Sequence, residues 1–222
     1  MTEQRAATIL KILKQTLALP SWTKQKRDPF ETLIVTIISQ NTADRNTDRA
    51  FESLSKHFEI TPEALAKTKK GEIQEAIKVA GLCRGKAETI KQAACTIHEK
   101  YQDSLKSILS LPLEEARKTL MQFPGVGPKT ADVVLLFSAG KPTIPVDTHV
   151  NRVSKRLGFA PEKGDYESVR FSLQTLYPPT EYLAVHLLFI AHGRKTCKAL
   201  RPLCKQCPVY EFCPSNWLGD KP

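Results

Sequence analysis

Apolar side chains recur roughly every three or four positions along this chain, which is the spacing that places them on one face of a helix. No segment alternates apolar and polar residues with the period of two that marks a half-buried strand. The pattern therefore predicts an all-α fold of about ten helices. Its clearest series are Ile9, Leu13 and Leu17, then Phe30, Leu33, Ile34, Ile37 and Ile38, and then Phe51, Leu54 and Phe58.

Capping residues indicate where several of these helices begin and end. Thr61 followed by Pro62 is typical of a helix start, because the hydroxyl caps the first turn and the N–H that proline lacks is not needed there. Gly81 should end the helix that contains Ile73, and another helix is expected from about Lys86 to Tyr101.

Two breaks in the pattern suggest two lobes, one of them discontinuous. The stretch Pro20–Pro29 is charged and contains the first proline. The second break, Gly140-Lys141-Pro142, follows a predicted helix.

Length and charge narrow the class of protein. A chain of 222 residues with 41% hydrophobic residues can bury a sizeable core, which argues against a disordered or fibrous protein. The net charge of +10 suits a polyanionic partner such as nucleic acid, although a solvated surface would carry the same charge. Apolar runs such as Val133–Phe137 are far shorter than the roughly 20 residues of a membrane span, and Met1–Arg5 lacks the apolar part of a secretory signal. We expect an intracellular monomer with no membrane partner.

Four of the six cysteines fall within 17 residues, which indicates a metal centre. Zinc commonly uses two separated Cys-x2-Cys pairs, and only one such pair is present, whereas a 4Fe-4S cluster accepts irregular spacings. Both groups stay open on spacing alone. The other two cysteines, Cys83 and Cys95, are expected to be small buried side chains. The four candidate ligands are Cys197, Cys204, Cys207 and Cys213.

Several cations surround these cysteines. They either present a positive surface to phosphates or offset the charge of the thiolates. They are Arg194, Lys195, Lys198, Arg201 and Lys205.

A glycine-rich turn lies between two helical patterns, Leu113–Met121 and about Gly127–Ser138. Gly125 and Gly127 allow a tight turn, and Pro128 suits the first turn of the second helix. The segment predicts a helix-hairpin-helix whose N–H groups bind a DNA phosphate, although a generic helix turn also uses glycine and proline. A nucleotide-binding P-loop is excluded, because Pro128 interrupts the Gly-Lys-Thr order.

Lys129 is a candidate nucleophile. In the first helical turn, the helix dipole and partial burial disfavour the ammonium form, and a neutral amine could attack a sugar carbon and form a Schiff base. An ordinary phosphate-binding or solvated lysine is the alternative.

Asp147 lies in the segment Val146-Asp147-Thr148-His149, which opens another helical pattern. It is either a helix N-cap or a carboxylate that stabilises the positive charge that develops on a sugar when a base is removed. His149, His186 and His192 form no recognisable metal set and are expected in the core or on helix surfaces.

These three motifs, in this order, resemble the endonuclease III family: Gly-Val-Gly-Pro-Lys129, then Val-Asp147-Thr-His eighteen residues after the lysine, then the C-x6-C-x2-C-x5-C loop. The resemblance covers nearly the whole chain. It implies the two-lobed helix-hairpin-helix DNA glycosylase fold. In that fold, a six-helix barrel over 24–141 accompanies a discontinuous iron–sulfur cluster lobe made of 1–23 and 142–222, with the cluster loop at 197–213.

The resemblance also implies the activity, which is a base-excision DNA glycosylase with abasic-site lyase activity that removes oxidised pyrimidines. Lys129 then matches the nucleophile and Asp147 the catalytic carboxylate, on opposite walls of the cleft between the lobes. The four cysteines would hold a 4Fe-4S cluster, with zinc as the alternative. The partner would be double-stranded DNA with damaged pyrimidines or abasic sites, in the cytoplasm of a prokaryote and associated with the nucleoid.

Two segments resemble the elements of this family that enter the DNA stack. Gln40 would fill the gap left by the extruded nucleotide, and Leu82 would wedge beside the orphaned base. A helix-end polar residue and a core leucine are the alternatives. The remaining candidate DNA-binding residues are Asn41, Gly125, Gly127, Thr130, His149, Arg194 and Lys195.

Three departures from the family leave the substrate open. Pro128 stands where bacterial members often have arginine, Asp132 where asparagine is usual, and Gln40 is followed by Asn-Thr-Ala-Asp. A monofunctional G:T or G:U mismatch glycosylase is one alternative, although its relatives tend to have tyrosine in place of Lys129. A non-catalytic DNA-binding module stapled by a metal is the other.

Overall fold

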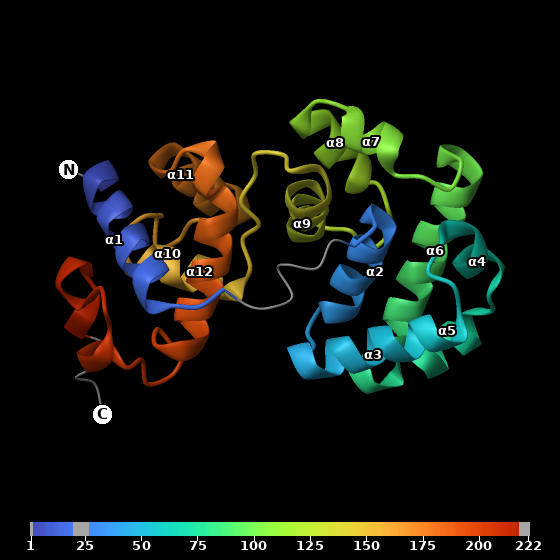
Figure 1. The fold of residues 1–222 in the computed structure, drawn as a ribbon, viewed down its shortest axis with the longest axis horizontal. Helices are drawn as coiled ribbons and strands as arrows, with labels where there is room; N and C mark the ends of the chain where they lie inside the picture. The colour runs from blue at the N-terminus through green and yellow to red at the C-terminus, as the bar shows by residue number, and fades with distance from the viewer. Residues whose placement is uncertain (1, 20–26, 218–222) are drawn as a thin grey trace. The chain divides into compact units, whose positions relative to one another are not determined.

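A computed structural model of the chain describes residues 2–19 and 27–217. Within these residues all regular secondary structure is helical and no strand occurs, so the predicted all-α fold is confirmed (Figure 1). The described part holds twelve α-helices, which is more than expected, because several of them are only five to eight residues long. None of the described helices has the length and apolar character needed to cross a membrane.

The chain folds as two compact units, Lys26–Lys141 and Met1–Gln25 with Pro142–Pro222. The predicted lobes, 24–141 and 1–23 with 142–222, differ from these units by two residues at the first break. That break, expected at 20–29, lies mostly outside the described residues.

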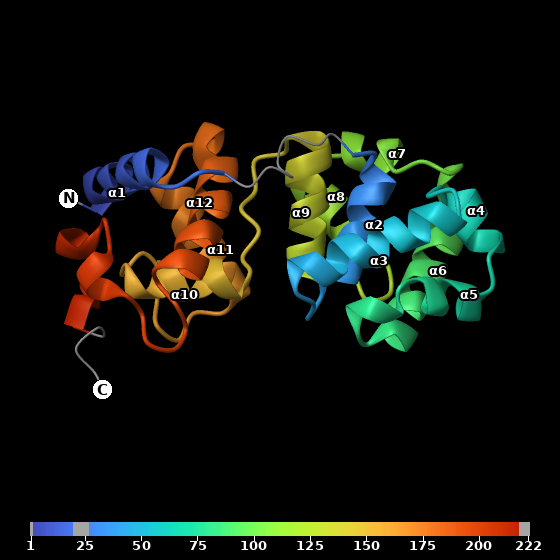
Figure 2. The ribbon, with the colours of Figure 1, turned by 60° about the horizontal axis from the view of Figure 1, so that its bottom comes forward.

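The unit of residues 26–141 is organised around two helices, α2 and α6, which pack on each other. One face of α2 is fully buried through Leu33, Ile34 and Ile37, as the apolar series predicted. Both views show α9 beside α2, with α8 against α9 (Figure 2). The helices are α2 Pro29–Ser39, α3 Asp44–His57, α4 Pro62–Lys67, α5 Lys70–Ala76, α6 Cys83–Tyr101, α7 Lys106–Ser110, α8 Leu113–Leu120 and α9 Pro128–Ala139.

Side-chain caps explain where some of these helices start. The Asp28 carboxylate accepts from the N–H of Phe30 at 2.8 Å and begins α2. Thr61 caps α4 through the N–H of Ala64 at 3.2 Å, as predicted. Such a cap stabilises a helix by about 1 kcal/mol, because it satisfies an N–H that has no partner within the helix.

The start of α6 differs from the prediction. The helix begins at Cys83 rather than near Lys86, because Leu82 adopts a left-handed conformation (φ 48°) directly before it. Gly81, with φ 65°, ends the short 3-10 helix Lys78–Ala80 rather than an α-helix. The expectation that Cys83 and Cys95 are buried was wrong, since both thiol side chains are partly exposed.

The second unit joins both ends of the described chain in one core. Helix α1 packs on α12 and α11, and Tyr177 donates to the carbonyl of Ala6 at 3.3 Å (Figure 1). Burial raises the pKa of Tyr177, which stays neutral. The rings of Phe159, Tyr177 and Phe189 pack on one another. The helices are α1 Thr2–Thr16, α10 Thr148–Arg156, α11 Tyr166–Leu176 and α12 Tyr182–Lys195, with 3-10 helices Pro179–Glu181, Cys204–Gln206 and Tyr210–Phe212.

Candidate active site

The glycine-rich turn joins α8 to α9 as a helix-hairpin-helix, as predicted. The turn is anchored in the core of its unit by the buried side chains of Phe123 and Val126. The N–H of Val126 donates to the carbonyl of Phe123 at 3.0 Å, and the Phe123 ring lies edge-on to Tyr101 with centroids 5.9 Å apart. These contacts hold the turn in one conformation.

The two glycines of the turn have different constraints. Gly125 has φ 71°, and a Cβ there would lie 2.6 Å from the Thr89 hydroxyl, so both conformation and space require glycine. Gly127 has φ −89°, and a Cβ would meet nothing within 4 Å. Gly125 therefore shapes the turn, whereas Gly127 leaves an open approach to the start of α9.

The first turn of α9 suits an anion. Its N-cap is Gly127, which has no side chain to cap the helix, and Pro128 occupies the first helical position. The N–H groups of such a helix end and the positive end of its dipole attract a phosphate. Lys129 follows, half-buried, and Thr130 is buried. Phosphate binding and the nucleophilic role of Lys129 remain predictions.

Gln40 is brought to this turn from the C-terminal end of α2. Its Nε2 donates to the carbonyl of Gly125 at 3.2 Å and to the Thr130 hydroxyl at 3.3 Å. The structure therefore groups three predicted DNA-binding residues that are up to 90 positions apart in the chain.

Leu82 and Asn41 lie on exposed loops of the same unit. Leu82 is 70% exposed, so the alternative of a core leucine is wrong. Both residues have left-handed backbones, with φ 48° at Leu82 and φ 52° at Asn41. A non-glycine residue in that region costs about 1–3 kcal/mol, and such strain occurs most often at functional sites.

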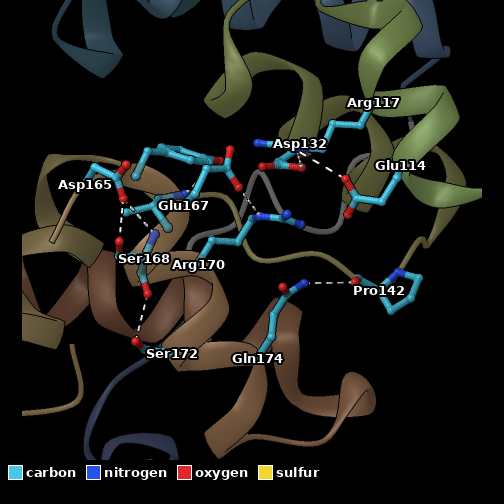
Figure 3. Close-up of polar contacts among 12 residues, drawn as sticks. Glu114, Arg117, Asp132, Pro142, Asp165, Glu167, Ser168, Arg170, Ser172 and Gln174 are labelled. Atoms are coloured by element: carbon cyan, nitrogen blue, oxygen red, sulfur yellow. Dashed lines mark hydrogen bonds and ion pairs between the residues drawn. The ribbon is translucent and has the colours of Figure 1, made fainter. Parts of the chain in front are cut away.

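Asp132 forms a buried ion pair that the sequence did not indicate. It is fully buried, and the Arg117 Nε donates to its Oδ1 at 3.0 Å (Figure 3). The guanidinium also lies 4.0 Å from the Glu114 carboxylate. This pair ties α8 to α9 on either side of the turn, and it gives the departure at position 132 a physical reason, since Asp132 can balance the charge of Arg117.

Asp147 is the N-cap of α10, and its Oδ1 accepts from the N–H of Val150 at 2.7 Å. The helix-cap interpretation is therefore confirmed. A cap needs only one of the two carboxylate oxygens, so capping and catalysis are compatible. Lys129 belongs to the unit of residues 26–141 and Asp147 to the other.

Arg152 is a site residue that sequence patterns missed. Its guanidinium lies 3.1 Å from Nδ1 of His149 and donates to the carbonyls of Gly193 and Cys197, both at 3.0 Å. A Cβ at Gly193 would lie 3.0 Å from His149. The half-buried His149 is thus held on α10 beside the end of α12. In the same unit, Gln174 of α11 donates to the carbonyl of Pro142 at 3.1 Å (Figure 3).

All four clustered cysteines line one cavity of the second unit. Burial, together with the neighbouring thiols, raises the pKa of Cys207 to about 11, and burial also raises the pKa of Cys213. Arg156 donates to Sγ of Cys197 at 3.4 Å and to the carbonyl of Lys198 at 2.6 Å.

The donors of this cavity fit an iron–sulfur or zinc centre, since four cysteine thiolates are a common ligand set for both. None of the four cysteines forms a disulfide. As placed, however, no three His, Cys, Asp or Glu side chains among the described residues are grouped tightly enough to hold a metal ion. The four cysteines around this cavity nevertheless fit such a group in chemistry.

His192 lies in the core, as expected, close to one of the clustered cysteines. It is buried, and its Nε2 lies 3.8 Å from Sγ of Cys207. Burial lowers the pKa of His192 to about 4, so its ring is neutral. The ring of His186 is also buried, with Nδ1 at 2.8 Å from the carbonyl of Pro145.

The five cations around the cysteine loop are all exposed to solvent. Together they give this part of the second unit a positive surface, and both expected roles, contact with phosphates and compensation of thiolate charge, stay predictions. They are Arg194, Lys195, Lys198, Arg201 and Lys205.

Comparison with known proteins decides the family. Residues 34–179 match the family model described as "HhH-GPD superfamily base excision DNA repair protein". The chain belongs to the HhH-GPD superfamily. The match includes the α8–α9 hairpin, Lys129 and Asp147.

Several superfamily members are similar over most of their length. The chain is 37% identical over 188 residues to endonuclease III of Sulfolobus acidocaldarius, which covers 84% of this chain and 82% of that protein. It is 33% identical to endonuclease III of Escherichia coli over 96% of both chains.

Solved structures show the same fold. A trapped covalent intermediate of an endonuclease III with DNA matches with a TM-score of 0.86 and 32% identity, and covers 100% of both chains. A thermostable thymine-DNA glycosylase matches with a TM-score of 0.72 and 25% identity, and covers 95% of this chain and 94% of that one.

The two turn glycines should respond differently to a methyl group. Gly125→Ala should lower the free energy of unfolding by about 2 kcal/mol, because alanine disfavours the left-handed backbone and would clash with Thr89.

Gly127→Ala should unfold like the wild type but bind duplex DNA about tenfold more weakly, because its methyl group would obstruct a charge-assisted phosphate contact. Thermal unfolding and fluorescence anisotropy measure the two effects, and unchanged DNA affinity of Gly127→Ala would remove the phosphate site from this turn.

Proposed function

We propose that this chain is a base-excision repair DNA glycosylase with abasic-site lyase activity, which removes oxidised pyrimidines from duplex DNA. The observation that carries the proposal is Lys129, which lies in the uncapped first turn of α9 directly after the glycine turn. In addition, the structure of an endonuclease III trapped in a covalent intermediate with DNA matches this chain over its full length. A helix-hairpin-helix alone would support only DNA binding, whereas a lysine at this place supplies an amine for covalent chemistry.

The reaction begins when the damaged nucleotide leaves the duplex. Leu82, on its exposed loop, wedges between the remaining bases, and Gln40 fills the gap. The glycine turn and the N-terminus of α9 hold the backbone phosphate next to the gap. Because these groups all belong to one compact unit, the extruded nucleotide is held close to Lys129.

Lys129 then acts as the nucleophile. Its neutral Nζ attacks C1′, the glycosidic bond breaks, and the base leaves with the bonding electrons and takes up a proton. The sugar ring opens, and the C1′–Nζ bond becomes a protonated Schiff base. Loss of a C2′ proton expels the 3′ phosphate by β-elimination, and water hydrolyses the Schiff base to restore the lysine.

Asp147 stabilises the positive charge that develops on the sugar as the base leaves. Its bond to the N–H of Val150 fixes the carboxylate at the start of α10. The positive end of the α10 dipole also attracts the carboxylate and helps to hold it at this end of the helix.

The four cysteines of the cavity would hold a 4Fe-4S cluster, and zinc is the alternative metal. When bound, the group would supply a rigid crosslink for the loop 197–213. Arg152 and Arg156 secure that loop from α10, through the carbonyls of Cys197 and Lys198. The five exposed cations around the loop would then contact the DNA backbone.

The proposed partner is double-stranded DNA with damaged pyrimidines or abasic sites, bound by a monomer in the cytoplasm of a prokaryote, near the nucleoid. The charge of +10 and the similarity to endonucleases III solved with DNA support this partner.

A second candidate, a G:T or G:U mismatch glycosylase, has one observation in its favour. The structure of a thermostable thymine-DNA glycosylase covers 95% of this chain with a TM-score of 0.72. The two candidates differ in chemistry, because a monofunctional enzyme releases the base without breaking the strand.

Borohydride trapping should separate these candidates. The protein is incubated with duplexes that contain thymine glycol, a G:T mismatch or an abasic site, and borohydride reduces any Schiff base to a stable adduct. We expect adducts that disappear in Lys129→Gln and persist in Lys118→Gln, an exposed lysine of α8 in the same hairpin. Base release from the mismatch with no adduct on any duplex would favour the monofunctional enzyme, and binding with neither would leave a DNA-binding module.

Asp147→Asn tests the carboxylate separately from the helix cap. Asparagine caps helices as well as aspartate, so the free energy of unfolding should change by less than about 0.5 kcal/mol. Single-turnover release of thymine glycol should slow at least about 100-fold, because the charge that opposes the sugar cation is lost. Normal turnover of this variant would limit Asp147 to its role as a cap.

Metal analysis tests the cysteine cavity. Protein purified without oxygen should contain iron and acid-labile sulfide in equal amounts, and Cys207→Ser should lose both. Cys95→Ser, on α6 of the other unit, should retain them. Stoichiometric zinc without sulfide would contradict the iron–sulfur assignment.

A further inference from the structure

Lys86 is the one buried lysine among the residues that the structure describes, with 5% of its surface exposed. It lies on α6, one turn after Leu82, and its backbone N–H donates to the carbonyl of Leu82 at 3.2 Å. Lys86 has no role in the proposed bond-breaking and bond-forming steps. A buried ammonium group is costly unless oxygen atoms surround it, so its partners are informative.

Three oxygen atoms accept from the ammonium group of Lys86. Nζ donates to the carbonyl of Ile38 at 2.8 Å, to the carbonyl of Ala80 at 3.1 Å and to the Thr42 hydroxyl. The Thr42 hydroxyl in turn lies 2.6 Å from the carbonyl of Ala80, which it can donate to. Every N–H of the ammonium group thus has an acceptor.

These acceptors lie on the two loops that carry the proposed DNA-penetrating side chains. Ile38 and Thr42 flank Gln40, two residues away on either side, and Ala80 lies two residues before Leu82. One ammonium group therefore joins the Gln40 loop to the Leu82 loop. The contacts are long-range in sequence, since Lys86 and Ile38 are 48 positions apart.

The chemical nature of the three acceptors suits a single positive charge at this position. They are neutral oxygens, and no carboxylate of the described residues lies within ion-pair distance of Lys86. Ile38 belongs to the last turn of α2, where carbonyls lack partners within the helix and the dipole favours a cation. Burial lowers the pKa of Lys86, because desolvation disfavours the ammonium form, and the three acceptors offset part of that cost.

We infer that Lys86 is a positioning residue, which holds the Gln40 and Leu82 loops at a fixed separation so that both side chains enter DNA as a preformed pair. Each loop contains a non-glycine residue in the left-handed conformation, Asn41 or Leu82, and the network of Lys86 supports both. The inference rests on the proposed roles of Gln40 and Leu82. Its consequence is that Lys86 acts on nucleotide extrusion and not on bond chemistry.

The test compares Lys86→Met with Lys91→Met. Lys91 is also on α6, and it also donates to backbone carbonyls, those of Ala66 and Thr68, but these end α4 and not a DNA-penetrating loop. The two variants therefore lose the same charge and the same kind of contact. Folding of each is checked by thermal unfolding, and single-turnover rates are measured on a thymine glycol duplex and on an abasic duplex.

We expect Lys86→Met to release thymine glycol at least about tenfold more slowly than Lys91→Met, because misplaced loops extrude a paired base poorly. On the abasic duplex, where no base pair opposes extrusion, the two variants should cleave within about threefold of each other. Unstacking of a 2-aminopurine placed beside the lesion should slow in parallel with base release. Equal losses on both duplexes, or no difference between the variants, would overturn the positioning role.

A second variant covers the case in which Lys86→Met does not fold. Thr42→Val keeps the side-chain shape but removes the hydroxyl that joins the loops, and it should slow thymine glycol release more than abasic-site cleavage. An unselective effect of Thr42→Val would also overturn the inference. If the wild type itself acts on neither duplex, the proposed function fails and not the assignment of Lys86.

Discussion

The turn at Gly125 is the constraint on which the candidate site depends. Its left-handed backbone and the nearby side chain of Thr89 require glycine, so a larger residue would change the path of the chain from α8 to α9. That path sets where α9 begins, and therefore where Lys129 lies. The carbonyl of Gly125 also accepts from Gln40, so the same turn orients a residue from α2. One local backbone requirement thus brings together the start of α9, where the proposed nucleophile Lys129 and the proposed anion site lie, and the side chain of Gln40.

Cations have internal as well as external roles in this protein. Arg117 balances buried Asp132 across the hairpin, Lys86 joins two loops, and Arg152 and Arg156 secure the cysteine loop through its carbonyls. Arg117 and Lys86 satisfy groups that would otherwise be buried without these hydrogen bonds, and an unsatisfied group of that kind costs about 1–3 kcal/mol. Part of the net charge of +10 therefore stabilises the fold, and the exposed cations near the cysteine loop add a positive surface to the second unit.

Features that depend on neighbouring residues could be predicted from the sequence. Helical periodicity, the cap at Thr61 and the glycine turn are local, and the helices α8 and α9 begin and end within about one residue of the predicted positions, as is usual for helix boundaries. Contacts between segments that are distant in the sequence could not be predicted, because they produce no pattern among neighbouring residues. The Arg117–Asp132 pair, the bond from Gln40 to the hairpin and the three acceptors of Lys86 are of this kind. The left-handed backbone of Leu82 was equally hidden, because leucine rarely adopts that conformation.

Lys129 is the proposed point of covalent attachment to DNA, and mass spectrometry of the reduced adduct can locate the attachment to a single residue. The protein is trapped with borohydride on an abasic duplex, digested with a protease and a nuclease, and the peptide that carries the sugar remnant is sequenced. We expect the remnant on Nζ of Lys129, in the peptide that contains Gly125 and Gly127. A remnant on another lysine or on the N-terminal amine would exclude Lys129 as the nucleophile, as would an active enzyme that yields no adduct.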